Sequence, residues 1–260
     1  MMNLRILCIG DVVGTAGCTF LRNHLPSFKK LHNVDLVICN GENSADGNGV
    51  TPKSADHLFT SGVDVITLGN HSFRRKEVYP YLDEQPTIIR PLNYPSPLTP
   101  GKGICTVDMG YTQVTVINLM GQEYIDARVD NPFTAMERLL PKLDGGITMI
   151  DFHAEATSEK RAMALWLDGR VSAVFGTHTH VMTADAEVLP GGTGYITDLG
   201  MTGPIDSVIG VKKEIVINRF LTKLPARFDY ENGACKMNCT LFEIDHKSGK
   251  CLSATSFELR

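Results

Sequence analysis

Short apolar runs alternate with helix-like segments along the chain, and this alternation limits it to a small set of folds. The runs are rich in β-branched residues, and most are bounded by Gly, Asn or Asp, as buried strands are. They lie at 4–10, 34–40, 63–69, 103–110, 113–120, 146–153, 171–176, 195–199 and 214–220. Helix-like segments occupy 17–30, 53–61, 76–82, 131–143 and 158–168. The alternation predicts an α/β architecture with mostly parallel strands.

No internal repeat, low-complexity linker or domain boundary interrupts this pattern. A chain of 260 residues with 43% apolar content can form one large domain or two small ones. We predict the simpler arrangement, a single domain over residues 1–260. The proline-rich segment 90–102 is expected to be an ordered surface loop, and 241–260 is expected to be a β-hairpin that turns at 247–249.

Charge and cysteine usage narrow the setting in which the protein works. The net charge is −4 and no basic block is present, so we expect no stable nucleic-acid complex, although a small anionic substrate remains compatible. The apolar start of the chain is broken by Arg5 and is too short for a signal or a membrane span. Seven cysteines, an odd number, indicate reduced thiols. A cytoplasmic protein with no membrane segment is therefore expected.

A zinc site made by the C-terminal cysteines is a weaker alternative. Cys235, Cys239 and Cys251 lie close in sequence to His246. Their spacing matches no standard zinc pattern. We expect these thiols to sit in the terminal hairpin instead.

Polar side chains follow five of the apolar runs, at the point where each run ends. They are Asp11, Glu42 with Asn43, Asn70 with His71, His153, and His178 with His180. The carboxyl ends of parallel strands form the ligand crevice of an α/β sheet. We therefore expect these side chains to converge, although they are far apart in the sequence.

The pair His178 and His180 indicates metal binding when it is taken together with the four other strand ends; alone, it could be two histidines on a polar loop. Residues i and i+2 of an extended backbone point to the same side, about 6.5–7 Å apart at Cα. Two imidazoles so placed can each hold one of two metal ions about 3.5–4 Å apart. Carboxylate, amide and imidazole ligands without cysteine suit Fe, Mn, Zn or Co, and the imidazoles argue against Ca.

The expected charge of such a centre suits a phosphodiester. Two carboxylates, two divalent ions and a bridging hydroxide sum to about +1, which complements a monoanion. The bridging hydroxide would attack phosphorus in line. His71, next to Asn70, can protonate the leaving oxygen, and the alternative is that it only forms local hydrogen bonds.

The strand-end motifs resemble those of the calcineurin-like metallophosphoesterase superfamily. The matching pieces are Gly10-Asp11, Gly41-Glu42-Asn43, Gly69-Asn70-His71, His153 and Gly176-Thr-His178-Thr-His180. The resemblance implies a four-layer α/β/β/α sandwich.

Two departures from the superfamily pattern point to one subfamily. Val13 stands where the superfamily has a histidine, and Glu42 stands at the bridging aspartate position. Both features, and the stretches 41–50, 153–160 and 198–211, are similar to the YmdB-like 2',3'-cyclic-nucleotide 2'-phosphodiesterases. The subfamily commonly has Asp where this chain has Arg74, which adds positive charge near the mouth of the site.

The resemblance implies a role for each strand-end residue. One metal ion would be held by Asp11, Glu42, Asn43 and His180, and the other by Glu42, Asn70, His153 and His178. His71 would be the catalytic proton donor. The metal pair would be iron, with manganese as the next choice and zinc less favoured, and the chain would form a homo-oligomer. Asp185 is a further candidate, which would hold a metal-binding imidazole through its carboxylate.

Together these features predict a di-metal phosphodiesterase that hydrolyses small cyclic nucleotides. A phosphomonoesterase or nucleotidase could use the same site. In a third alternative the protein is a non-catalytic regulator that senses a nucleotide.

Overall fold

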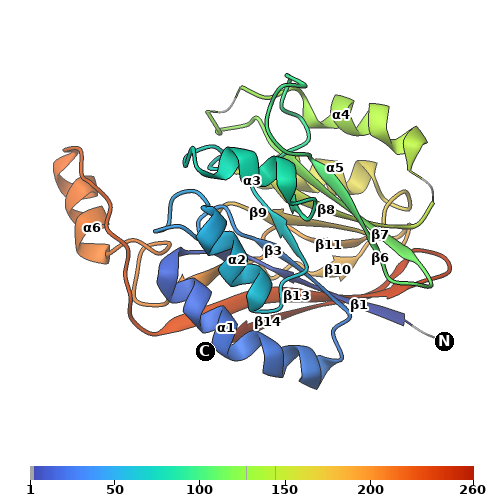
Figure 1. Cartoon of the computed structure of the whole chain (residues 1–260), viewed down its shortest axis with the longest axis horizontal. Coiled ribbons are helices and arrows are strands. Elements are labelled where there is room, and N and C mark those ends of the chain that lie inside the picture. Colours follow the sequence, from blue (N-terminus) through green and yellow to red (C-terminus); the bar gives the residue numbers. More distant parts are fainter. Residues whose placement is uncertain (1–2, 127, 144) are drawn as a thin grey trace.

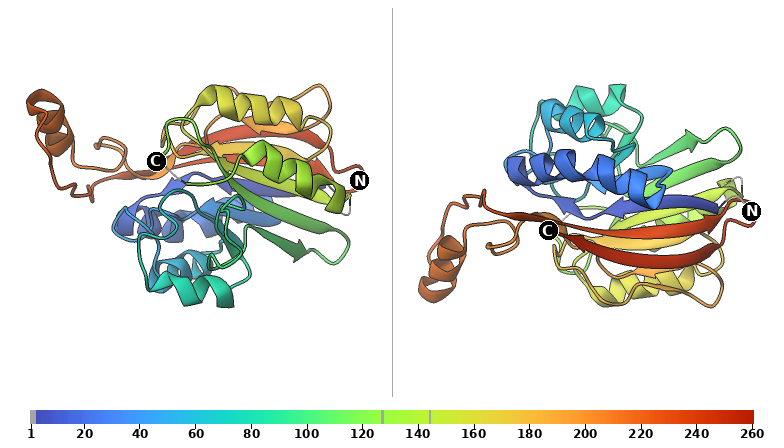
Figure 2. Two further views of the ribbon diagram at one scale, coloured as in Figure 1. Left: turned by 90° about the horizontal axis from the view of Figure 1, so that it is seen from above. Right: turned by 90° about the horizontal axis from the view of Figure 1, so that it is seen from below.

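The computed structural model describes residues 3–126, 128–143 and 145–260, which fold into two stacked sheets with helices on both outer faces (Figures 1 and 2). The strands are β1 Asn3–Ile9, β2 Asp11–Val12, β3 Leu36–Asn40, β4 Val65–Thr67, β5 Ile88–Ile89, β6 Ile104–Asp108, β7 Gln113–Met120, β8 Ile147–His153, β9 Ala173–Thr177, β10 Glu187–Val188, β11 Gly194–Ile196, β12 Met201–Pro204, β13 Cys235–Asp245 and β14 Cys251–Leu259. The helices are α1 Gly14–His32, α2 Pro52–Thr60, α3 Val78–Glu84, α4 Pro132–Leu139, α5 Thr157–Trp166 and α6 Lys213–Thr222, with a short 3-10 turn at Leu140–Lys142.

Each sheet has a parallel centre and antiparallel additions. The first runs β2-β12-β13-β1-β3-β4-β5, with β14 paired to β13, and the second runs β10-β11-β9-β8-β7-β6. Strands β1, β3, β4 and β5 are mutually parallel, as are β7, β8, β9 and β11. Strand β13 pairs with β1, and β6 pairs with β7, both in the antiparallel sense. The four-layer sandwich is confirmed, and the expectation of mostly parallel strands holds for the centre of each sheet but not for the additions.

Three apolar layers hold the four structural layers together. In β1, Leu7 and Ile9 pack under α1, whereas Leu4 and Ile6 face the second sheet, because successive side chains of a strand point to opposite faces. A third layer lies between the second sheet and the helices α4 and α5. Both sheets thus share the middle layer of the core.

Local signals place most of the helices and the terminal hairpin as expected. Thr51 caps α2 through a reciprocal pair of hydrogen bonds with Ser54, and the side chain of Asn131 caps α4. Strands β13 and β14 form the predicted hairpin. All seven cysteines are free and buried, and Cys235, Cys239 and Cys251 lie in the hairpin strands, as expected.

The expected strand at 214–220 is wrong, because these residues lie in helix α6. The helix projects from the body (orange in Figures 1 and 2). Its one buried residue is Val216, and no strand in the described part of the chain pairs with it. Hydrogen bonds within the helix satisfy its backbone N–H and C=O groups instead. A left-handed Lys223 ends the helix.

We call residues 205–234 the arm, which consists of a stem (205–212 and 228–234) and the projecting α6. The two halves of the stem pair through backbone bonds, in which Ile205 donates to Ala234, Lys212 to Asp229 and Glu231 to Gly210. Apolar side chains are exposed on and after α6, at Ile217, Phe220, Leu221 and Leu224.

Among the described residues, no helix is both long enough and apolar enough to span a membrane.

Candidate metal centre

The eight strand-end side chains of both sheets lie together at one end of the sandwich. In the first sheet Asp11 begins β2, directly after β1, and Glu42, Asn43, Asn70 and His71 follow β3 and β4. In the second sheet His153 ends β8, and His178 and His180 follow β9. Direct contacts, all 3.6 Å or shorter, join all eight into one network.

One half of the network surrounds the buried His153. Its Nε2 lies 2.8 Å from Asn70 Oδ1, 3.2 Å from Glu42 Oε1 and 3.1 Å from His178 Nδ1. The ligand atoms of Glu42, His153 and His178 all lie within 4.8 Å of one another. This cluster has the donor types and the spacing of a metal site.

The other half of the network surrounds His180. Its Nε2 lies 3.6 Å from Asp11 Oδ1 and 3.2 Å from Asn43 Nδ2. The amide oxygen of Asn43 instead faces His71 Nδ1 at 2.7 Å. As a metal ligand beside His180, Asn43 would have to turn its amide over, which exchanges the oxygen and the nitrogen.

Glu42 lies between the two halves. Its Oε1 contacts His153, and it is also 3.4 Å from His71 Nδ1, while its Oε2 accepts a hydrogen bond from the backbone N–H of His71. The side chain is 1% exposed. This central position is the one that a bridging ligand requires.

Hydrogen bonds fix which nitrogen of each histidine faces the cluster. The Thr177 hydroxyl donates to Asp151, so it can only accept a bond from Nδ1 of His153, which lies 2.9 Å away. The backbone carbonyl of Ile209 is 3.0 Å from Nδ1 of His180 and can likewise only accept. Both bonds place the proton on Nδ1 and leave Nε2 free to bind a metal ion.

His178 is oriented in the opposite way. Its Nε2 lies 3.2 Å from the carboxylate of Glu155, which leaves Nδ1 facing His153. Because the Glu155 carboxylate accepts a hydrogen bond from Nε2–H, the unprotonated Nδ1 of His178 would be the atom that binds a metal ion.

The residues fit a metal pair by a second observation. Oδ1 of Asp11 is buried and has no hydrogen-bond partner. A buried carboxylate oxygen without a partner is costly, and a cation satisfies it. The oxygen and imidazole donors suit Fe, Mn or Zn.

The charges of the network shift the pKa values of its members in opposite directions. Burial favours the neutral form of His153, but Glu42 and Asp11 outweigh burial and raise its pKa to about 9. Burial and the neighbouring His153 lower the pKa of His178 to about 3. Burial also lowers the pKa of His71. Coupled groups of this kind are typical of functional sites.

The turn that carries His178 and His180 is strained and is held by a buried ion pair. Both histidines have positive φ, of 105° and 64°, which non-glycine residues rarely adopt. Lys160 donates to Asp198 at 2.7 Å, and Asp198 accepts from the backbone N–H groups of Thr179 and Gly200. The pair thereby ties α5 to the turn.

The expectation that Asp185 holds an imidazole is wrong. Its carboxylate accepts hydrogen bonds from Thr183 and Thr197. The groups that contact the imidazoles from outside the cluster include Glu155, Thr177, the Asn40 amide and the Ile209 carbonyl. Glu155 and Thr177 could have been suspected from the sequence, because they lie within two positions of predicted ligands. The Ile209 carbonyl could not, because every residue has a backbone carbonyl.

Comparison with known proteins adds the family. Residues 7–257 match the model of the YmdB-like protein family. The chain belongs to this family. A 2',3'-cyclic-nucleotide 2'-phosphodiesterase from Bacillus subtilis is 44% identical over 251 residues, which cover 96% of this chain and 94% of that protein. The family assignment made from the strand-end motifs is confirmed.

Two solved structures show the same fold over nearly the whole chain. A hypothetical protein from Thermus thermophilus is 42% identical, with a TM-score of 0.92 and coverage of 98% of this chain and 99% of that one. A phosphatase from Mycoplasma pneumoniae is 34% identical, with a TM-score of 0.95 and coverage of 100% and 94%. This YmdB-like chain is accordingly a phosphoester hydrolase of the metallophosphoesterase type.

Proposed function

We propose that the protein hydrolyses small 2',3'-cyclic nucleotides at the 2' ester with two metal ions. The single observation that carries the proposal is Glu42, a buried carboxylate that contacts His153 in one half of the network and His71, which faces Asn43 of the other half. The name of the B. subtilis relative supports the substrate class. We propose iron as the metal, with manganese as the alternative.

In this proposal each network residue has one task. Asp11, Glu42, Asn43 and His180 hold one ion, and Glu42, Asn70, His153 and His178 hold the other. When bound, a metal pair held by these residues would make a hydroxide nucleophile available and neutralise charge on the phosphate. Thr177, Glu155 and the Ile209 carbonyl keep the free nitrogen of each imidazole turned inward.

His71 donates the proton that the leaving group needs. Its Nδ1 is held by Asn43, so Nε2 remains for the substrate. Water adds to phosphorus, the bond to the 2' oxygen breaks, and that oxygen takes the proton, which leaves a 3'-monophosphate. A lowered pKa makes the protonated ring a readier donor.

The experiment compares a phosphodiester with a phosphomonoester. Wild type and Glu42→Gln are loaded with Mn or Fe and assayed on bis-p-nitrophenyl phosphate, p-nitrophenyl phosphate and 2',3'-cyclic AMP. We expect turnover of the diesters by wild type, and a loss of about 1,000-fold or more in the variant, since Gln removes the central charge. Metal analysis of freshly purified protein identifies the native ion.

Other outcomes would contradict the proposal. Preference for the monoester would indicate a phosphatase or nucleotidase on the same site. A wild type that contains metal but turns over neither ester would indicate a nucleotide-sensing regulator. Equal activity of Glu42→Gln and wild type would remove Glu42 from the chemistry.

We further propose that residues 1–260 work as one cytoplasmic metallophosphoesterase domain that forms a homo-oligomer. Both sheets contribute ligands, which supports one domain. Helix α6 supports self-association, because Leu221 is 79% exposed and a ten-residue helix is marginal without packing partners. Light scattering measures the mass, and a strictly monomeric protein would contradict this assembly.

A further inference from the structure

The stem of the arm forms the second wall of the cavity in front of the metal centre. A cavity of about 480 Å³ is lined on one side by site residues such as Glu42, His71 and His178. Its other side is lined by Ile209, Val211, Phe228 and Tyr230 of the stem. A small ligand bound at the metal centre would therefore lie next to the stem.

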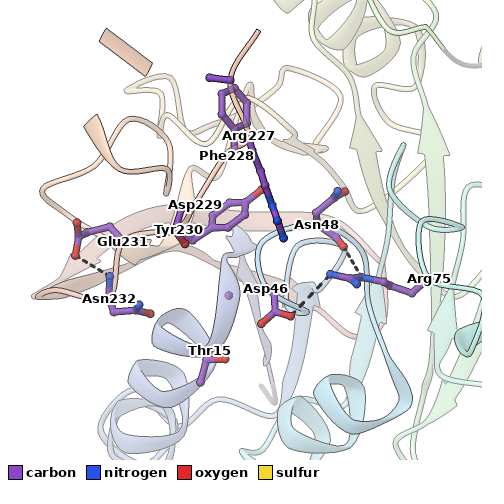
Figure 3. A pocket seen from close by; sticks show the side chains of 12 residues that line it. Thr15, Asp46, Asn48, Arg75, Arg227, Phe228, Asp229, Tyr230, Glu231 and Asn232 are labelled. Atoms are coloured by element: carbon purple, nitrogen blue, oxygen red, sulfur yellow. Dashed lines mark hydrogen bonds and ion pairs between the residues drawn. The ribbon is translucent and has the colours of Figure 1, made fainter. Parts of the chain in front are cut away.

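A second cavity of about 890 Å³ adjoins the first beneath the arm (Figure 3). Asn48, Phe228 and Tyr230 line both cavities. The two aromatic side chains thus stand at the boundary, next to the metal centre but outside its network.

Tyr230 is held by direct packing on the loop that follows Glu42. Gly47 has φ +70°, and a Cβ at this position would lie 2.1 Å from the Tyr230 ring. The bridge between Val211 and Tyr230 fixes the same residue within the stem. The ring is therefore positioned before a ligand arrives.

Phe228 is 40% exposed although it is large and apolar. The guanidinium of Arg219 lies 5.2 Å from the centre of its ring. An exposed aromatic ring beside a phosphate-reacting centre offers a stacking surface for a nucleobase.

The charges beneath the arm favour a neutral group over a second phosphate. The larger cavity is lined by Asp46, Asp229 and Glu231 against two cations, Arg75 and Arg227. Arg75 lies 3.8 Å from Asp46, which partly neutralises it. Asp229 is also paired, with Lys212, so the lining carries no excess of positive charge. A nucleic-acid strand would bring further phosphates into this nearly balanced space, whereas a single nucleoside would not.

We propose that Phe228 and Tyr230 form a nucleobase subsite, so that the arm selects mononucleotides over other phosphodiesters. The proposal rests on the proposed function, because it places the base relative to a phosphate at the metal centre. It assigns substrate recognition to the stem and leaves the chemistry with the strand ends.

The test compares a substrate that has a base with one that lacks it. Phe228→Ala, Tyr230→Ala and Tyr230→Phe are assayed on 2',3'-cyclic AMP and on 1-O-methylribose 2,3-cyclic phosphate. Tyr111→Ala is the matched control, because Tyr111 is another exposed aromatic residue but lies at the turn between β6 and β7, outside both cavities. The metal content of each variant is measured alongside.

We expect each alanine variant to raise the KM for cyclic AMP about tenfold or more, with kcat and metal content near those of wild type. The KM for the base-free substrate should not change, and Tyr230→Phe and Tyr111→Ala should behave as wild type. Equal effects on both substrates, or no effect on either, would overturn the subsite.

Binding distinguishes this proposal from the proposed function. Calorimetry of adenosine 3'-monophosphate and ribose 3-phosphate with metal-loaded protein needs no turnover. If wild type hydrolyses neither cyclic phosphate but binds the nucleotide more tightly than the sugar, and Phe228→Ala removes that preference, the activity is wrong and the subsite stands. If no preference is found, the subsite is wrong even where hydrolysis occurs.

Discussion

The two sides of the active cavity are built in opposite ways. The metal centre is made of strand ends from two packed sheets, and Asp11, Glu42 and His153 are at most 1% exposed. The stem opposite reaches the cavity from a projecting arm, and its Phe228 is 40% exposed. The comparison indicates that chemistry is fixed by the core, whereas recognition depends on a peripheral element that can change without disturbing the sheets.

The two sides nevertheless touch at two points. The Ile209 carbonyl of the stem orients His180, and Tyr230 packs on Gly47. Ile209 has a positive φ of 49°, so the stem backbone is strained at the residue whose carbonyl contacts His180. Movement of the arm would therefore reach one metal position, that of His180, before the other.

The largest contrast is expected between a buried ion pair at the metal centre and an exposed pair on the arm. Lys160→Met leaves Asp198 buried without its partner, which costs about 3–5 kcal/mol and releases the turn of His178 and His180. We expect a lower Tm and reduced metal content. The matched variant Lys213→Met breaks the exposed pair with Asp206 and should change neither quantity measurably.

The double variant Lys160→Met, Asp198→Asn makes this test sharper. Removing both charges should recover much of the lost stability, because no unpaired charge remains buried. Metal content should stay low, since the tie between α5 and the turn is changed. Equal Tm values for Lys160→Met and Lys213→Met would contradict the contrast between core and arm.

A second contrast concerns glycines on the two sides. A Cβ on Gly69 would lie 2.3 Å from the His153 ring, which has no room to move. Gly69→Ala should therefore lower metal affinity about 10–100-fold, the size of effect seen when the support of a metal ligand is disturbed. Gly233→Ala in the stem meets nothing closer than 3.8 Å and should bind metal normally. Metal titration of the two variants checks this, and equal affinities would show that the His153 ring can shift.

The same contrast explains what could be read from the sequence. Strand ends carry polar side chains in regular places, so the α/β class and the convergence of the eight strand-end residues could be predicted from apolar runs and the groups that follow them. The four-layer sandwich was implied by the resemblance of these motifs to the metallophosphoesterase superfamily. The residues of the arm, and the groups that orient the imidazoles, do not follow strands in such a regular way. The run 214–220 looks like a strand because Ile215, Val216 and Ile217 are β-branched, yet none of the strands that the structure describes pairs with it.

The groups that support the imidazoles were hidden for a different physical reason. The Ile209 carbonyl acts through the backbone, which every residue has. Asp198 and Lys160 meet only after folding brings α5 beside the end of β9. Asp185 was predicted to hold an imidazole, and only the path of the chain shows that it bonds Thr183 and Thr197 while Asp198 supports the turn.

The smallest expected effect concerns Arg74, an exposed side chain that lines the cavity beside His71. Arg74→Asp reverses a charge at the mouth without touching the network, so kcat should be unchanged. The KM for a monoanionic cyclic nucleotide should rise about two- to fivefold at low salt, because an exposed charge interacts weakly across water. At about 1 M salt the Debye length falls to about 3 Å, and the difference between the variant and wild type should disappear. Arg74→Gln, which removes the charge without reversing it, should lie between the two. A change that persists in high salt would mean that Arg74 contacts the substrate directly, and recognition would then extend from the stem to the loop that carries His71.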